Sequence, residues 1–173
     1  HETLGVEFLL TSRYTVPITG MREREMHTIH TVIIGGGQAG LATSYHLQQR
    51  GIEHIVLEQA DHLAHAWRDQ RWDSFALNTP NWTVQMPGAA YEGDDPEGFL
   101  PQEEMVRFFE DYVQKHSLPV QCGERVTAVE PHEAGGWRVV SDKDTYHAEN
   151  VVVATGLFQT PKIPVFSKDL SPR

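Results

Sequence analysis

A glycine-rich turn followed by a carboxylate is the group of residues in this sequence that most directly indicates chemistry. The turn reads Gly35-Gly-Gly-Gln-Ala-Gly40, and Glu58 stands at the end of the next apolar run. A pyrophosphate needs close contact with hydrogen-bond donors, and backbone N–H groups at a helix N-terminus supply donors together with a favourable dipole. We expect Gly35 to permit a tight turn, Gly37 to let the backbone approach the phosphates, and Gly40 to let the helix pack against the strand.

Glu58 is placed where a carboxylate can accept hydrogen bonds from both hydroxyls of an adenosine ribose. The same charge would repel a 2′-phosphate, which disfavours NADP at this position. Between the outer glycines, Gly36, Gln38 and Ala39 complete the predicted phosphate-binding turn. The glycine pattern alone is weak evidence, because ordinary strand-to-helix connections also use glycine. Its context favours dinucleotide binding, since a strand precedes the turn, a helix follows it, and the acid comes after the second strand.

The segments around this turn have the patterns of a β-α-β unit. Residues 29–34 form a short β-branched run with the continuous apolar end that is typical of a buried parallel strand. A helix is expected after the turn, ending at Gly51 in the left-handed conformation, and residues 52–57 are expected to form the second strand. The predicted fold class is therefore α/β, a Rossmann-like domain on a parallel sheet.

The remaining sequence predicts one more helix and a series of strands. Apolar residues from Met105 to Val113 recur at helical spacing, so a helix that opens at Pro101 should bury this stripe in the core. The stretch from 61 to 100 has no sustained period and is expected to be ordered loop with at most one short strand. A three-stranded β-meander and then a final parallel strand are expected at residues 125–130, 137–141, 145–148 and 151–156.

Composition excludes several classes of protein. The 173 residues carry 14 Lys and Arg against 24 Asp and Glu, and the formal net charge of -10 repels nucleic acid and anionic membrane surfaces. No apolar run approaches the length of a membrane-spanning helix. Cys122 is the single cysteine, which excludes an internal disulfide and a Cys-x-x-Cys pair and favours a reducing, cytoplasmic location. A homo-oligomer stays open.

Further segments stand out for their order along the chain. They read Leu63-Ala-His-Ala-Trp-Arg68, Ser74-Phe-Ala-Leu-Asn-Thr-Pro80, Met86-Pro-Gly88, Val151-Val-Val-Ala-Thr-Gly156 and Pro161-Lys-Ile-Pro164. In this order they resemble the flavin-containing monooxygenase superfamily and its bacterial flavoprotein relatives, which have two dinucleotide-binding domains. The resemblance covers residues 29 to about 166. It implies FAD as the cofactor, where the glycine turn alone leaves FAD and NAD open.

The resemblance also implies roles for individual residues. Trp67 and Arg68 would lie along the cofactor, and Asn78 would lie nearest the flavin ring. Asn78 is the one candidate for a catalytic role, although Asn before Thr-Pro is equally an ordinary turn former. The backbone of Val126 would contact adenine, while Thr155 and Gly156 would close the pocket. The complete expected cofactor site is Gly35, Gly36, Gly37, Gln38, Ala39, Gly40, Glu58, Gln59, Trp67, Arg68, Asn78, Val126, Thr155 and Gly156.

Members of the superfamily continue into a second glycine fingerprint, for NADPH, and a later Gly-Asp segment, whereas this sequence ends at Arg173. We therefore expect residues 1–28 to be an N-terminal extension, tag or fragment boundary, and 29–166 to be the N-terminal half of an FAD-binding domain. Residues 167–173 would be a truncated link toward a missing NAD(P)H domain. The resemblance implies an FAD-dependent monooxygenase or oxidoreductase that oxidises NAD(P)H and oxygenates a small molecule, with this chain alone inactive.

Two other functions use the same glycine turn. An NAD-dependent dehydrogenase is one, and a noncatalytic dinucleotide-binding module is the other. The missing Cys-x-x-Cys pair disfavours the disulfide reductase branch of the architecture. No metal site is expected, because His62 and His65 could share an ion but show no third ligand.

Overall fold

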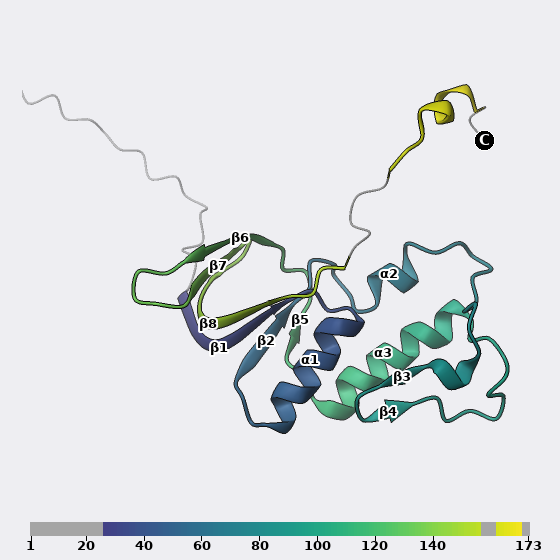
Figure 1. The fold of residues 1–173 in the computed structure, drawn as a ribbon, viewed down its shortest axis with the longest axis horizontal. Helices are drawn as coiled ribbons and strands as arrows, with labels where there is room; N and C mark the ends of the chain where they lie inside the picture. Colours follow the sequence, from purple (N-terminus) through teal and green to yellow (C-terminus); the bar gives the residue numbers. More distant parts are fainter. Residues whose placement is uncertain (1–25, 157–161, 171–173) are drawn as a thin grey trace, which may run out of the picture.

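A six-stranded sheet organises the computed structural model, which describes residues 26–156 and 162–170 (Figure 1). The strand order is β5-β2-β1-β8-β7-β6, and a separate two-stranded sheet pairs β3 with β4. The strands are β1 (Met26–Ile34), β2 (His54–Leu57), β3 (Gln85–Met86), β4 (Ala89–Ala90), β5 (Val120–Gln121), β6 (Val126–Pro131), β7 (Trp137–Ser141) and β8 (Thr145–Val153). The α-helices are α1 (Gln38–Gln49), α2 (His65–Arg68) and α3 (Gln102–His116), and two 3-10 helices are η1 (Asn81–Thr83) and η2 (Val165–Asp169).

The parallel half of the sheet confirms the predicted α/β fold class. β1 lies between β2 and β8 and is parallel to both, and β5 adds a further parallel strand beside β2. Val32 and Ile33 at the centre of β1 are fully buried. A strand that is covered on both faces has no solvent-exposed side, which explains the continuous apolar run in the sequence.

Three strand predictions need correction. β1 begins at Met26, three residues before the predicted start, because its first residues pair with Thr145 and its neighbours in β8. The last meander strand and the final parallel strand are one continuous strand, β8. Glu149 and Asn150 interrupt the apolar pattern because they are exposed, but the ladder to β1 runs past them. β5 was not predicted, since two residues are too few to show a period.

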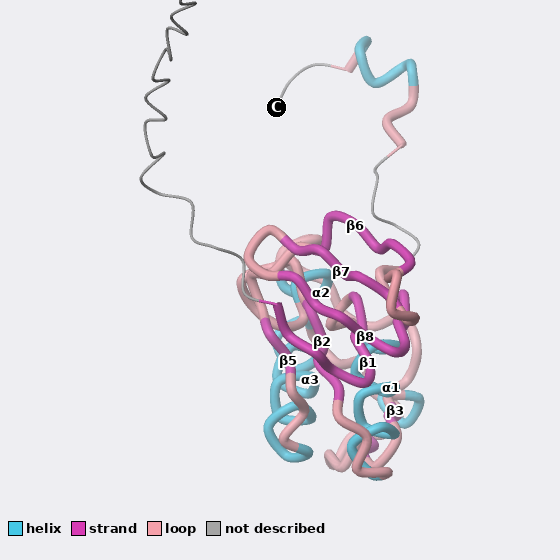
Figure 2. The backbone as a smooth tube through the Cα atoms, turned by 90° about the vertical axis from the view of Figure 1, so that its left-hand side faces the viewer, coloured by secondary structure: helices cyan, strands magenta, loops and turns pink. Residues whose placement is uncertain are grey.

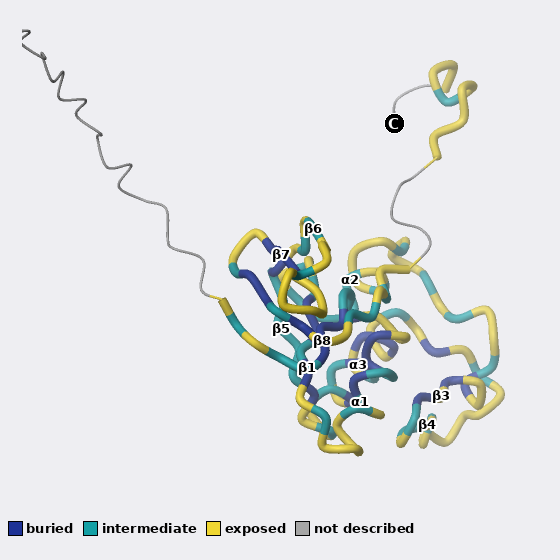
Figure 3. Tube along the Cα trace, turned by 60° about the vertical axis from the view of Figure 1, so that its left-hand side comes forward, coloured by how far each residue is buried: buried dark blue, intermediate teal, exposed yellow. Residues whose placement is uncertain are grey.

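Helices α1 and α3 lie side by side on one side of the sheet (Figure 1). The stripe predicted in α3 is confirmed, because Met105, Phe109 and Tyr112 are buried in the core that Leu41 of α1 shares. The ring of Tyr112 lies 6.0 Å from that of Tyr45 in α1. Figure 3 shows buried positions along both helices. This packing sets the position of α1, and with it the glycine turn, relative to α3.

The face of the sheet opposite the helices carries a second buried cluster, which includes residues of β7 and β8. Side chains alternate along β1, so Ile33 faces Gly40 of α1 while Val32 points away from the helices. Val32 packs with Leu57 and with Val139 and Tyr146 of β7 and β8. The β6–β7–β8 strands thus form the predicted meander, and Figure 2 shows them continuing the sheet beyond β1.

The stretch from 61 to 100 is mostly loop, as expected, but it contains more structure than one short strand. It holds α2, η1 and the β3–β4 hairpin. Asn81 is buried in this segment, where its side-chain amide donates to the carbonyl of Asp95 at 2.8 Å. Among residues 26–156 and 162–170, none of the helices combines the length and apolar character needed to cross a bilayer.

Candidate dinucleotide-binding site

The glycine turn joins β1 to α1 and is closed by contacts that exclude side chains. Gly35 has a φ of 109°, and a Cβ there would stand 2.5 Å from the carbonyl oxygen of Ala154. A Cβ on Gly40 would stand 2.0 Å from the carbonyl oxygen of Gly35 and 3.4 Å from Ile33. Both positions therefore require glycine for the turn itself to fold. The sequence suggested that Gly40 is needed for packing of the helix on the strand, but its closest contact is with Gly35 of the turn.

Gly37 differs from its neighbours because a Cβ at this position would meet no atom within 4 Å. The residue is the N-cap of α1, and its carbonyl accepts the first helical hydrogen bond, from Leu41 at 2.9 Å. Gly37, Gln38 and Ala39 are exposed, and within the described part of the chain no side chain caps this helix. Open space, N-terminal N–H groups and the absence of an acid in the first turn fit a pyrophosphate.

Glu58 reaches back to the turn from the end of β2. Its Oε2 accepts a hydrogen bond from the N–H of Gly36 at 2.7 Å, and its Oε1 accepts one from the N–H of Ala60 at 2.9 Å. These two bonds fix both carboxylate oxygens beside the turn. Each oxygen retains acceptor capacity, so the carboxylate can still receive ribose hydroxyls. Gln59 follows and is exposed.

The chain entering β6 lies beside Glu58. The N–H of Glu58 donates to the carbonyl of Gln121, and the N–H of Glu124 donates to the carbonyl of Glu58 at 2.8 Å. Val126 starts β6 and is paired with Ser141, next to an irregularity in the ladder. Val126, the residue predicted to contact adenine, therefore lies two positions after Glu124, which is hydrogen-bonded to Glu58.

Glu124 is a fully buried carboxylate that sequence reasoning missed. Its Oε1 accepts hydrogen bonds from Ser141 at 2.6 Å and Tyr146 at 2.8 Å, and its Oε2 accepts one from Gln121. Burial, followed by the bond to Glu124, raises the pKa of Tyr146, which keeps the phenol protonated as a donor. The cluster joins β5, β7 and β8 immediately before Val126.

The end of β8 meets the glycine turn. Ala154 donates its N–H to the carbonyl of Ile34 at 2.8 Å, and the Cα of Thr155 would lie 3.3 Å from a Cβ on Gly35. Gly156 has a φ of 78°, so the chain turns sharply there. The structure thus brings Ala154 and Thr155 against the turn, while the closing of a cofactor pocket by Thr155 and Gly156 stays a prediction.

A cavity of about 170 Å³ lies near the start of α1. Its volume is below the roughly 300 Å³ of a typical ligand pocket, so it could take part of a ring system but not a whole dinucleotide. Asn78 is exposed between Leu77 and Thr79, which both line the cavity. The lining residues are Gln38, Trp67, Leu77, Thr79, Thr83, Val84, Gln85, Met86, Met105, Phe108 and Phe109.

Trp67 and Arg68 were both expected along the cofactor, but their side chains have different neighbours. Trp67 lines the cavity and stacks on Phe109 with ring centroids 6.2 Å apart. Arg68 forms an ion pair with Glu110 of α3 and is exposed. Gln102 donates to the carbonyl of Trp67 at 2.8 Å, which fastens α2 to the start of α3. The structure brings Trp67 to the same cavity as Gln38, and it does not bring Arg68 there.

The structure places a third candidate ligand, Asp69, beside the histidine pair, which the sequence did not reveal. Asp69 accepts hydrogen bonds from His62 and His65, and these bonds, that of His62 foremost, hold the pKa of the Asp69 carboxyl below its usual range. The spacing of four residues between His65 and Asp69 was the available signal, because α2 places such residues on one face. The stated reason for expecting no metal site is therefore wrong.

Cys122 lies half-buried close to Glu58. Burial raises the pKa of its thiol, and the negative charges of Glu58 and Asp61 raise it further. A thiol with a raised pKa carries little thiolate at neutral pH and is a poor nucleophile. Cys122 is therefore a poor candidate for a catalytic nucleophile.

Known proteins resemble the chain over most of its length. An uncharacterized CzcO-like oxidoreductase of Geobacillus kaustophilus is 38% identical over 145 residues, which are 84% of this chain and 41% of that protein. An indole-3-pyruvate monooxygenase of Arabidopsis thaliana is 30% identical over 140 residues, 78% of this chain and 33% of that protein. The chain thus spans about two fifths or less of the length of these relatives.

Solved structures confirm the fold. A flavin-containing monooxygenase from Stenotrophomonas maltophilia superimposes with a TM-score of 0.71 at 31% identity, covering 80% of this chain and 42% of that one. This match and the plant relative confirm the expected similarity to flavin monooxygenases. A bacillithiol disulfide reductase from Bacillus cereus gives a TM-score of 0.72 at 23% identity over 79% of this chain and 42% of that one, which shows the fold alone. Because residues 32–170 match the model of one family, the chain belongs to the pyridine nucleotide-disulphide oxidoreductase family.

Proposed function

We propose that this chain is the FAD-binding part of an NAD(P)H-dependent flavin monooxygenase or oxidoreductase. The observation that carries the proposal is the bond from Gly36 to Glu58, which sets a carboxylate beside an open helix N-terminus. The pyrophosphate would lie on the exposed turn at Gly37 to Ala39. The ribose hydroxyls would reach the two oxygens of Glu58, which the backbone already orients.

The rest of the expected site is consistent with a long cofactor that runs along one edge of the sheet. At one end, the backbone at Val126 follows directly on the segment bonded to Glu58. At the other end, Gln38 and Trp67 line the cavity beside Asn78. The adenine would lie at Val126 and the edge of the flavin at the cavity, with the pyrophosphate between them on the glycine turn. Arg68, paired with Glu110, would contact the cofactor only after leaving that partner.

The preference for a flavin monooxygenase rests on relatives and on the single cysteine of this chain. The relatives at 30% identity or more include proteins named as flavin or indole-3-pyruvate monooxygenases. The chain has one cysteine, and that thiol has a raised pKa, which favours the monooxygenase branch over a disulfide reductase. When bound, the flavin would supply hydride acceptance from NAD(P)H and activation of oxygen. The protein residues would bind, orient and shield the ring.

The test is nucleotide identification on the full-length protein. We expect the purified protein to be yellow and to release FAD on denaturation, as measured by chromatography against FAD, FMN and NAD standards. Replacing Glu58 by glutamine should weaken FAD binding by about tenfold or more, because one oxygen becomes an amide donor. The matched control is Glu53→Gln, an exposed glutamate just before the same strand.

Two outcomes would overturn the proposal. A colourless protein that takes up NAD but not added FAD would support the NAD-dependent dehydrogenase instead. A protein that binds FAD but oxidises no NAD(P)H with oxygen would support the noncatalytic dinucleotide-binding module. Equal FAD affinity in Glu58→Gln and Glu53→Gln would remove the assigned role of Glu58.

A further inference from the structure

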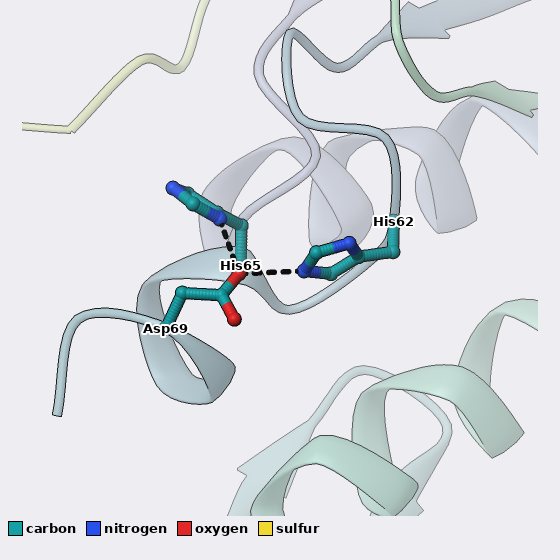
Figure 4. A group of neighbouring side chains, drawn as sticks. All are labelled: His62, His65 and Asp69. Carbon is teal, nitrogen blue, oxygen red and sulfur yellow. Dashed lines mark hydrogen bonds and ion pairs between the residues drawn. The ribbon is translucent and has the colours of Figure 1, made fainter. Parts of the chain in front are cut away.

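Two histidines and an aspartate, none of them part of the glycine turn, converge on one point at α2. Figure 4 shows the imidazoles of His62 and His65 directed at the carboxylate of Asp69. His62 belongs to the loop before α2, His65 begins the helix, and Asp69 follows its last residue. Nε2 of His62 and Nδ1 of His65 each lie 2.6 Å from Oδ2 of Asp69. All three ligand atoms lie within 4.8 Å of one another.

We propose that His62, His65 and Asp69 bind a divalent transition-metal ion, Zn²⁺ being the best match, with a fourth position open to water. Two imidazole nitrogens and one carboxylate oxygen form a ligand set that such ions accept and that Ca²⁺ and Mg²⁺ do not prefer. Three protein ligands with one exchangeable position are typical of an open zinc site.

The ligand atoms must move to accept an ion, because the two nitrogen–oxygen distances have to open and the nitrogen–nitrogen distance, up to 4.8 Å here, has to close. Zinc ligands lie about 2.0–2.2 Å from the ion, which puts neighbouring ligand atoms of a tetrahedral site about 3.3 Å apart. The nitrogen–oxygen distances here would widen by roughly 0.7 Å as the ion replaces the shared protons. The side chains of His62 and Asp69 are each 41% exposed, so rotations of this size meet little resistance and the ion can enter from solvent.

The surroundings leave the carboxylate available to an ion. Within the residues described, the ion pairs of Asp69 are those with the two histidines, and Arg68, the arginine next to it in the sequence, is paired with Glu110. Nε2 of His65 lies 3.4 Å from the side-chain amide of Gln70. With its amide turned over, Gln70 would accept the remaining ring proton and hold His65 in the metal-binding tautomer.

An ion at this point would connect two parts of the chain. It would tie the loop that follows Glu58 to α2, which carries Trp67 into the cavity lining. The inference does not depend on the identity of the dinucleotide, because no atom of the proposed site belongs to the glycine turn.

Metal binding can be measured directly on the full-length protein after chelator treatment. Titration with Zn²⁺ by calorimetry is expected to saturate at one ion per chain at this site, and Co²⁺ is expected to give the intense visible absorption of a four-coordinate ion. His62→Ala, His65→Ala and Asp69→Asn should each weaken binding by more than about tenfold. Asp69→Asn is informative because its amide oxygen can still accept both histidine bonds while the charge is lost.

The matched control is His132→Ala. His132 and His147 form another half-buried histidine pair, with ring centroids 4.0 Å apart, but no carboxylate completes a metal-binding group with them within the described ranges. Binding is expected to be unchanged in this variant. The proposal is overturned if the unmodified protein shows no saturable Zn²⁺ binding, or if His132→Ala weakens binding as much as His62→Ala. Far-UV circular dichroism of each variant verifies that the fold is retained.

Discussion

Individual glycines in the turn have separable roles. Gly40 is needed for packing, since a Cβ would stand 2.0 Å from the carbonyl oxygen of Gly35. Gly37 faces open space, so the protein itself has no steric need for glycine there. Glycine at such an exposed helix N-terminus would instead allow a ligand such as a pyrophosphate to approach the backbone N–H groups closely.

Substituting alanine at these two positions should separate folding from binding. Gly40→Ala is expected to lower the free energy of unfolding by more than about 2 kcal/mol, because backbone atoms must move to admit the methyl group. Gly37→Ala should change it by less than about 1 kcal/mol while weakening FAD binding. Urea unfolding and fluorescence titration measure the two effects. Equal destabilisation by both substitutions would contradict the assignment.

Cys122 provides a pH-dependent prediction at the same scale. Because its pKa is raised in the folded state, the stabilising contribution of the neutral thiol is present below the unfolded-state pKa and is lost as pH rises through the folded-state value. The rate of alkylation by iodoacetamide should therefore rise with pH to a midpoint above that of the urea-unfolded protein. A folded-state midpoint at or below the unfolded one would be inconsistent with the burial described.

At the scale of elements, one strand joins the two halves of the sheet. β8 pairs with β7 through residues 145–148 and with β1 along nearly its whole length. The buried cluster around Glu124 then fixes the entry to β6 against β7 and β8. These contacts set where the backbone of Val126 lies relative to Glu58.

The cluster should behave as a unit in unfolding experiments. Glu124→Ala leaves three donors without their acceptor and is expected to lower the free energy of unfolding by about 3 kcal/mol or more. Tyr146→Phe removes one donor and should cost about 1 kcal/mol. A double-mutant cycle in urea would show coupling between the two sites. Equal effects of the single substitutions, with no coupling, would disprove the shared network.

At the scale of the whole molecule, two features bear on function: the net charge, and the share of its relatives' length that the chain covers. A formal charge of -10 disfavours polyanionic partners and leaves anion binding to the local N–H groups of the turn. The chain spans about two fifths of the length of the bacterial relatives it matches. Catalytic turnover is therefore proposed for the full-length protein and not for this chain alone.

Cofactor binding should appear as a change in overall stability. A ligand that binds only the folded state stabilises it by about 2.7 kcal/mol at a hundredfold excess over its dissociation constant. FAD is therefore expected to raise the melting temperature by about 5 °C or more, measured by calorimetry. Glu58→Gln should reduce this rise, because the carboxylate that would receive the ribose hydroxyls is lost. An unchanged rise in Glu58→Gln would exclude the proposed ribose contact.

Local patterns in the sequence were enough for much of the fold. The apolar stripe of α3, the left-handed Gly51 and the strand–turn–helix order around Gly35 are encoded within a few residues, so they could be predicted. The position of Glu58 was also readable, because its spacing from the turn is a property of the β-α-β unit.

Only the tertiary structure decided the remaining features. The continuity of β8, the bond of Glu58 to Gly36, the buried network of Glu124 and the pairing of Arg68 with Glu110 all join residues that are distant in the sequence. Asp69 joins the two histidines as a third candidate ligand only because the loop carrying His62 folds onto α2. Periodicity reports which face of an element is apolar, whereas register and packing between elements determine which polar groups meet.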